Sequence, residues 1–114
     1  IKPGNQKYNF ENFSKESMLK GNLPHNNPMW RKTIHEKNGY FNDKYKSAGD
    51  WDFWLRCAFG GAMFKKHPEI LGIYYPNPFG MSSNPEHESD RAQQQREVFS
   101  NYRQKYFESM RAEP

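Results

Sequence analysis

The chain has 114 residues, 34% of them hydrophobic and 17% aromatic, and its formal net charge is +4. This length allows one domain and excludes a multidomain machine. No apolar run approaches the ~18 residues of a membrane-spanning helix, and Cys57 as the single cysteine excludes an internal disulfide and a multi-cysteine zinc site. Because each buried ring removes roughly 150–250 Å² from water, we expect one folded unit over 1–114 with a core rich in aromatic rings.

The first third of the chain is expected to be mostly irregular. Residues 1–28 are rich in Gly, Pro and Asn, which are turn formers, and residues 1–22 of them form an irregular lead-in. Within it, Ser14 as a helix start and Gly21 as a stop predict one short helix. A helical turn over 33–37 is expected to close near Gly39, since glycine adopts a positive φ at low cost.

Three segments are predicted to be short strands. Residues 29–32 form the first, and residues 62–66 and 70–75 form two more on either side of Pro68. Turn-forming residues follow over 76–84. Strands and helices together make α+β the expected fold class.

Two longer helices are predicted from apolar spacing. The first begins at Asp50, whose carboxylate can cap it, and ends at the Gly-Gly pair 60–61. The second is the C-terminal helix over 84–111, with Asn84 as cap and Pro85 in the first position. Its expected apolar stripe runs at three- and four-residue steps through Ala92, Phe99, Tyr102, Tyr106 and Met110.

The densest cluster of chemically useful side chains lies at the start of the first of these helices. Asp50 and Asp52 flank Trp51, and Arg56 follows four residues after Asp52. A carboxylate at a helix N-terminus is stabilised in the ionised form that a general base requires, and indole rings suit the apolar faces of a sugar or a base. The alternative is structural: Asp50 is a cap, Asp52 and Arg56 form an i,i+4 pair, and the indoles fill the core.

Other patterns carry little functional signal. No pair with the helical spacing of metal ligands occurs among the four histidines, His25, His35, His67 and His87. Ser82 and Ser83 lie in no Gly-x-Ser-x-Gly pattern, and the glycines match neither a phosphate-binding loop nor a dinucleotide motif. Acidic residues are mixed with the basic and aromatic ones, so a continuous positive groove for nucleic acid is not expected.

Three blocks in order resemble a known arrangement. They are Met29-Trp30-Arg31-Lys32, the segment from His35 to Phe41, and the acidic segment from Gly49 to Arg56. Their order and gaps are similar to those of the C-terminal half of GT-A glycosyltransferases, most of all the bacterial family 2 enzymes, with further similarity to a segment of β-1,4-galactosyltransferases. The resemblance implies the C-terminal portion of a GT-A fold, an α+β architecture with short strands, a central helix and a long C-terminal helix.

The resemblance also implies a reaction and its residues. A glycosyltransferase of this kind moves a sugar from a nucleotide-sugar donor to an acceptor hydroxyl, with inversion. Asp50 matches the catalytic base, and the loop 77–83 matches a segment that closes near the donor. Trp30 lies where the family lines the acceptor side, and Asp52 and Arg56 shape the site. The expected substrate-binding residues are therefore Trp30, Trp51, Asp52 and Arg56.

The donor-binding half of such an enzyme has no counterpart in this sequence. In the family an Asp-x-Asp motif in that half holds a divalent metal, Mn²⁺ or Mg²⁺, whereas the only Asp-x-Asp here, Asp50 to Asp52, belongs to the base segment. The metal ligands are expected mostly outside this chain, which alone is expected to be inactive. Gly49 replaces the family's usual Glu, and Lys46-Ser47 replaces the aromatic-Gly pair of the galactosyltransferases. A cytoplasmic location is expected, with membrane association through other parts of the protein left open.

Two other functions remain open at this point. A non-enzymatic module would use Trp30, Trp51 and Trp54 to contact a glycan or a single-stranded nucleic acid. A degenerate piece would fold and oligomerise through the aromatic face of residues 92–110. The glycosyltransferase hypothesis predicts no nucleic-acid partner, so binding of an oligonucleotide alone would favour the first alternative.

Overall fold

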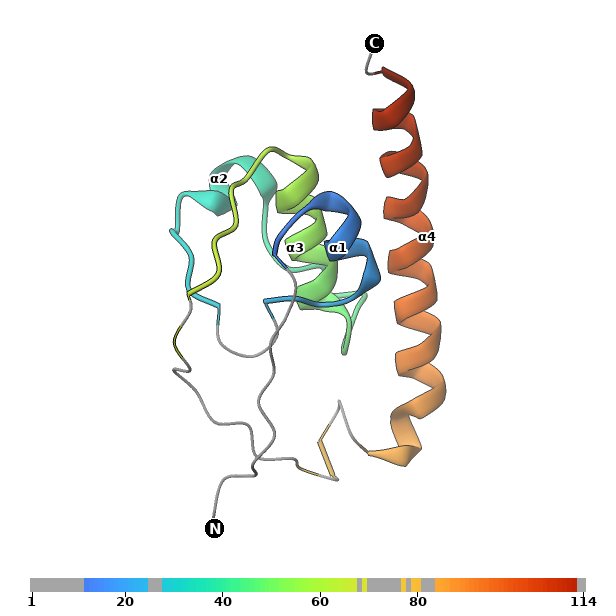
Figure 1. Ribbon diagram of the computed structural model, residues 1–114. Coiled ribbons are helices and arrows are strands. Elements are labelled where there is room, and N and C mark those ends of the chain that lie inside the picture. The colour runs from blue at the N-terminus through green and yellow to red at the C-terminus, as the bar shows by residue number, and fades with distance from the viewer. Residues whose placement is uncertain are drawn as a thin grey trace.

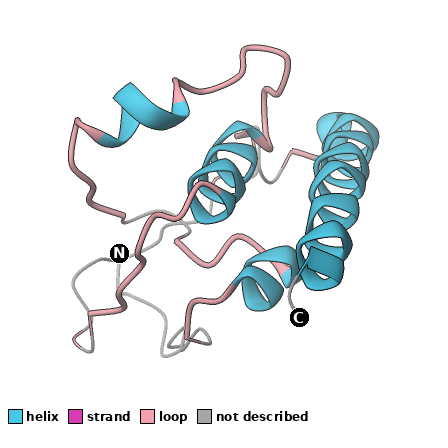
Figure 2. Cartoon of the chain, turned by 90° about the horizontal axis from the view of Figure 1, so that it is seen from above, coloured by secondary structure: helices cyan, strands magenta, loops and turns pink. Residues whose placement is uncertain are grey.

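Helices form the architecture of the part of the chain that the structure describes. This computed structural model describes residues 12–24, 28–67, 69, 77, 79–80 and 84–112. The elements are α1 (Lys15–Lys20), α2 (Ile34–Asn38), α3 (Gly49–Phe59), the 3₁₀ turn η1 (Pro85–His87) and α4 (Glu88–Ala112). Figures 1 and 2 show α3 in the middle, with α2 on one side of it and α4 on the other.

The core forms where α1 and α4 pack on α3. Met18 of α1, Phe53 and Leu55 of α3, and Val98 of α4 are fully buried. Partly buried rings surround them, namely Phe13, Trp51, Phe59, Phe64 and Tyr106. The expected ring-rich core is therefore confirmed, and its apolar area comes largely from aromatic side chains.

Local sequence specifies both ends of α1. The Ser14 side chain accepts a hydrogen bond from the backbone N–H of Ser17 at 3.0 Å, and Ser17 Oγ accepts one from the backbone N–H of Ser14 at 2.8 Å. This reciprocal capping box satisfies donors that a helix end otherwise leaves open. The helix ends before Gly21, so the predicted short helix is confirmed.

A side chain of α4 holds the start of α3. Gln94 Oε1 accepts hydrogen bonds from the backbone N–H groups of Ser47 and Ala48, at 2.8 and 3.3 Å, and from the Ser47 hydroxyl at 3.1 Å. Because Ala48 precedes the helix and α3 begins at Gly49, the prediction that Asp50 caps this helix is wrong. Asp50 lies inside the first turn instead, where the positive end of the helix dipole favours a carboxylate.

Two further contacts fasten the loop before α3 to α4. Lys44 forms an ion pair with Glu97, and Asn101 Nδ2 donates to the Tyr45 hydroxyl at 3.4 Å. Together with Gln94, these α4 residues follow one another at steps of three and four, so they share one face of the helix. That face sets the position of the loop that leads into α3.

The predicted α+β fold class, a GT-A portion with short strands, is wrong for the described residues, which contain helices and no strand. Residues 29–32 and 62–66 are not strands, and residues 70–75 lie outside the described part. In the second segment Ala62 and Phe64 pack against the core while Met63 faces solvent. The two-residue alternation is therefore real, but it places residues 62–66 against the helical core without a pairing strand in the described part, and a sheet needs such a neighbour.

The long helix α4 covers the core with a narrower stripe than predicted. Val98 and Tyr102 are buried and Tyr106 packs at the edge of the core, whereas Phe99 and Met110 are exposed. Figure 1 shows the C-terminal end of α4 extending past the other helices. Despite its length, neither α4 nor any other described helix is apolar enough to cross a membrane.

Candidate functional site

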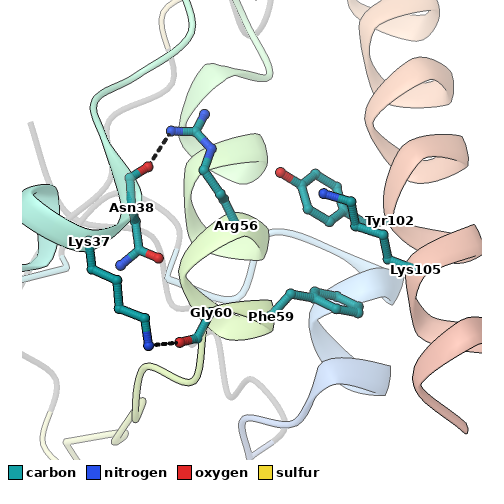
Figure 3. Close-up of a pocket in the computed structure, with 7 residues that line it drawn as sticks. All are labelled: Lys37, Asn38, Arg56, Phe59, Gly60, Tyr102 and Lys105. Atoms are coloured by element: carbon teal, nitrogen blue, oxygen red, sulfur yellow. Dashed lines mark hydrogen bonds between the residues drawn. The ribbon is translucent and has the colours of Figure 1, made fainter. Parts of the chain in front are cut away.

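Two of the predicted site residues, Asp50 and Arg56, each line a hollow on the described surface. The Asp50 hollow, of about 290 Å³, is lined by Phe41, Tyr45, Lys46, Ser47, Gly49 and Asp50. The Arg56 hollow, of about 400 Å³, lies between α2, α3 and α4 (Figure 3), and its lining residues are Lys37, Asn38, Arg56, Phe59, Gly60, Tyr102 and Lys105. The two hollows differ in which polar groups are still able to bind a ligand.

The Asp50 carboxylate is held by two donors. Its Oδ2 accepts a hydrogen bond from Asn22 Nδ2 at 2.8 Å, and its Oδ1 accepts one from the backbone N–H of Trp51 at 2.8 Å. The side chain is partly buried, so the carboxylate has a defined position and an open side toward the hollow. A carboxylate has about four lone-pair sites, and these two bonds still allow it to accept a hydroxyl proton.

An aromatic face, made of Trp30, Tyr40 and Phe41, adjoins the Asp50 hollow. These residues are 40, 68 and 43% exposed. Phe41 lines the hollow itself, and its ring meets that of Trp30 edge to face, with centroids 6.3 Å apart. Beneath the face, Phe41 packs on Phe53 of α3 at a centroid distance of 4.7 Å. A ligand bound beside Asp50 would therefore contact the exposed ring of Phe41.

His35 lies at the centre of these rings. Its imidazole stacks between Tyr40 and Phe53, with centroid distances of 4.4 and 4.9 Å. Its Nε2 is 3.1 Å from Trp30 Nε1, and its Nδ1 is 2.7 Å from the carbonyl oxygen of Gly39. An indole N–H only donates and a carbonyl only accepts, so the imidazole proton must lie on Nδ1 while Nε2 accepts from Trp30.

Arg56 shapes the loop that carries the aromatic face. Its Nη1 donates to the carbonyl oxygens of Asn38 at 2.9 Å and Tyr40 at 2.7 Å, and its Nη2 donates to Asp52 Oδ2 at 2.6 Å. The carbonyl between the first two, that of Gly39, bonds to the imidazole described above. Gly39 has a φ of 74°, which lets the chain turn so that three successive carbonyls face these two side chains.

Asp52 is a buried charge whose partner is Arg56. Only 7% of its side chain is exposed, and an unpaired carboxylate at such a position is costly. Tyr102 of α4 lies beside the pair, and Figure 3 shows its phenol oxygen pointing toward Arg56. Burial and the nearby Asp52 charge raise the pKa of Tyr102 to about 12, so its phenol is neutral at physiological pH.

The cations of the Arg56 hollow are committed to protein groups. Lys37 Nζ donates to the carbonyl oxygen of Gly60 at the end of α3 (Figure 3). Lys105 Nζ lies over the ring of Tyr102, 4.9 Å from its centroid, and Arg56 has the three partners just described. Positive charges at the end of α3 also offset the negative end of its dipole. The polar groups of this hollow therefore connect α2, α3 and α4 to one another and are not free to bind a ligand. The Asp50 hollow is the candidate site.

The predicted substrate-binding residues separate into two groups. Trp30 lies on the aromatic face, whereas Trp51 packs against the core and donates its Nε1–H to the carbonyl oxygen of Met18 at 2.8 Å. Asp52 and Arg56 bond to each other as described. The structure links Trp30 to the Asp50 hollow through Phe41, which sequence reasoning did not single out. Its position two residues after the turn at Gly39 was the available signal.

Catalysis by a thiolate or by a metal bound to this site has no support among the described residues. They contain no group of three His, Cys, Asp or Glu side chains able to hold a metal ion, and Asp52 is engaged by Arg56, so the Asp50 to Asp52 pair does not fit one. Burial raises the pKa of the Cys57 thiol, which disfavours a nucleophilic thiolate.

The predicted donor-side loop 77–83 lies largely outside the described part.

Comparison with known proteins returns no match. The chain matches no protein-family model, and neither a curated protein nor a solved structure matches it at a significant level. The function is therefore inferred from the side chains of this chain and their geometry.

Replacing Arg56 should destabilise the fold. Arg56→Met leaves the Asp52 carboxylate buried without its partner, and we expect the free energy of unfolding to fall by about 3 kcal/mol. Urea denaturation followed by circular dichroism measures this change. The double variant Asp52→Asn with Arg56→Met should recover part of the loss, and Arg96→Met, on the exposed side of α4, should change little. An Arg56→Met midpoint equal to the wild type would contradict the assigned role.

Tyr102 should make stability depend on alkaline pH. Its pKa is about 12 in the folded chain and 10.0 for an ordinary tyrosine, so the folded state keeps the phenol proton that the unfolded state releases. The stabilisation is complete below pH 10 and is lost as the pH rises toward 12. In urea titrations at pH 9 and 11.5, Tyr102→Phe should lose less stability than the wild type, while Tyr40→Phe, an exposed site, should follow the wild type. Parallel losses in all three proteins would contradict this assignment.

Proposed function

We propose that this chain is the acceptor-binding, base-bearing part of a glycosyltransferase, with Asp50 as the general base. One observation carries the proposal. Asp50 presents a carboxylate, in the first turn of α3, to a hollow whose wall is the half-exposed ring of Phe41. A transferase needs this combination because the acceptor hydroxyl must be bound and deprotonated at the same place.

In the proposed reaction Asp50 takes the proton of the acceptor hydroxyl. As the proton leaves, the hydroxyl oxygen forms a bond to the anomeric carbon of the donor sugar. The bond from that carbon to the diphosphate oxygen breaks, and the diphosphate leaves with the electron pair. Asn22 and the Trp51 N–H hold the carboxylate during this step. Attack on the face opposite the leaving group inverts the configuration of the sugar.

The aromatic face would supply most of the binding energy for the acceptor. The C–H groups on one side of a pyranose ring pack well on aromatic rings. Phe41 offers an exposed ring in the wall of the hollow, and the exposed ring of Trp30 meets Phe41 edge to face. Lys46 is exposed at the rim and can donate to sugar hydroxyls, while Ser47 is placed by its hydrogen bond to Gln94. The hollow thus combines an apolar wall with a few polar groups, as ligand sites commonly do.

The nucleotide-sugar donor, and the Mn²⁺ or Mg²⁺ expected with it, are proposed to bind to other parts of the protein. The described residues offer no ligand set for such a metal. The isolated chain should therefore bind acceptor sugars without transferring any.

Changing the base should abolish transfer without disturbing the fold. Asp50→Asn is nearly isosteric and can still accept from the Trp51 N–H, but its amide cannot take a proton. In a polypeptide that joins this chain to its donor-binding part, we expect turnover to fall at least a hundredfold, with donor binding unchanged. The assay is product formation from a nucleotide sugar. Asp43→Asn, an exposed site, is the control, and near-normal turnover of Asp50→Asn would remove the assignment.

A binding module for glycans or single-stranded nucleic acid is the second candidate, because the same exposed rings can stack on bases. An NMR titration of the ¹⁵N-labelled chain tests the nucleic-acid form of this candidate, with methyl β-D-galactopyranoside, methyl β-D-glucopyranoside and a single-stranded oligonucleotide as probes, and the turnover assay of Asp50→Asn tests the glycan form. The proposed function predicts shifts around Phe41 and Asp50 with a glycoside, and a weaker affinity in Phe41→Ala. Phe99→Ala is the control, since Phe99 is 41% exposed and Phe41 is 43% exposed. Shifts with the oligonucleotide alone would favour the binding module.

A further inference from the structure

We propose that neutral His35 positions Trp30 on the aromatic face, and that protonation of His35 weakens acceptor binding. The proposal rests on the proposed function, because it takes Trp30 as an acceptor contact. His35 is a positioning residue here: its imidazole acts on the acceptor through the indole and not by contact with the sugar.

Both imidazole nitrogens are occupied, and their roles cannot be exchanged. Nδ1–H donates to the carbonyl oxygen of Gly39 at 2.7 Å, and Nε2 accepts from Trp30 Nε1–H at 3.1 Å. The ring is also stacked between Tyr40 and Phe53, nearly parallel to both, at interplanar angles of 6 and 21°. The stack holds the ring plane, so the lone pair of Nε2 keeps its direction toward the indole.

The hydrogen bond to His35 is the directional contact of the Trp30 ring. Among the described residues, the other ring contacts of this indole are with aromatic faces and edges, at centroid distances of 4.9 Å to Trp54, 6.3 Å to Phe41 and 6.5 Å to Phe53. Ring contacts tolerate several orientations, whereas a hydrogen bond weakens steeply when its angle changes. Loss of the bond therefore frees the indole to change its tilt on the aromatic face.

A second proton on His35 breaks this bond. The imidazolium carries N–H on both nitrogens, so Nε2–H would point at Trp30 Nε1–H and two donors would face each other. Because the stack and the Gly39 carbonyl still hold the imidazole, the ring that moves is the indole, which is 40% exposed. An acceptor sugar that binds to the aromatic face then contacts a Trp30 ring in a changed position.

Charged and titratable groups other than His35 lie on the elements around it. These elements are α2, the segment before it, the loop after it, and α3, and the groups on them are Arg31, Lys32, Glu36, Lys37, Tyr40, Asp43, Lys44, Tyr45, Lys46, Asp50, Asp52, Arg56 and Cys57. Asp52 is paired with Arg56, and Lys44 with Glu97. A pH response of the Trp30 indole that disappears when position 35 carries a non-titrating side chain is therefore assigned to His35.

Two variants separate the hydrogen bond from the ring. His35→Gln offers an amide oxygen to the indole and an N–H to the carbonyl, and it does not titrate. His35→Phe keeps a ring in the stack but offers no acceptor to Trp30. His87→Gln, which removes a histidine from η1, is the control for titration elsewhere.

The experiment follows the indole N–H signals of the ¹⁵N-labelled full chain from pH 8 to pH 5, with the Trp30 signal assigned by Trp30→Phe. In the wild type and in His87→Gln, this signal should shift as the pH falls. In His35→Phe it should already lie at the low-pH position at pH 8, and in His35→Gln it should not move. The affinity for methyl β-D-galactopyranoside or methyl β-D-glucopyranoside should fall roughly three- to tenfold in the wild type, the equivalent of one hydrogen bond, and stay constant in His35→Gln.

The outcomes separate this inference from the proposed function. A pH-independent Trp30 signal in the wild type, or the same pH profile in His35→Gln as in the wild type, would overturn the positioning role. If neither glycoside shifts any resonance at any pH, the proposed function and the effect of His35 on acceptor binding are overturned together. The Trp30 signal without sugar would still show in that case whether His35 controls the indole.

Discussion

The hydrogen bonds and the ion pair of the Arg56 guanidinium are the interactions on which the rest of the structure depends. The guanidinium neutralises Asp52, a carboxylate inside the core, and it binds the carbonyl oxygens of Asn38 and Tyr40 in the loop after α2. The first contact makes a buried charge tolerable in a small domain, and the others decide the course of the loop. Phe41 follows Tyr40 in this loop, so the ring that forms the wall of the candidate site is positioned by the same guanidinium that pairs with Asp52.

The second constraint is the attachment of α4 to the loop before α3. Gln94 places the backbone from which α3 starts, and α3 in turn carries Asp50 in its first turn. Phe53, one turn further along, supports both His35 and Phe41. The carboxylate and the rings of the proposed site are therefore presented by the same central helix, with α4 behind it as a support.

Sequence reasoning succeeded where the signals are local and failed where they are not. The ends of α1 and the turn at Gly39 were predictable because Ser14, Ser17 and the two glycines act within a few residues. The cap of α3 was placed two residues late, at Asp50 instead of Ala48, because the side chain that accepts hydrogen bonds at this end is Gln94, far along the chain. Alternation at 62–66 could not reveal that these residues pair with no strand in the described part of the chain. The role of His35 depends on stacking between a loop and α3, which spacing does not encode.

Arg56 and His35 hold the loop by hydrogen bonds to backbone carbonyl oxygens, which every amino acid possesses. The side chains at positions 40 and 41 can therefore change in the course of evolution without loss of the loop's shape, whereas Gly39, with its positive φ, cannot change as freely. The same helices could then present other residues beside Asp50. A scaffold of this kind keeps a carboxylate in a fixed position while the side chains beside it diverge.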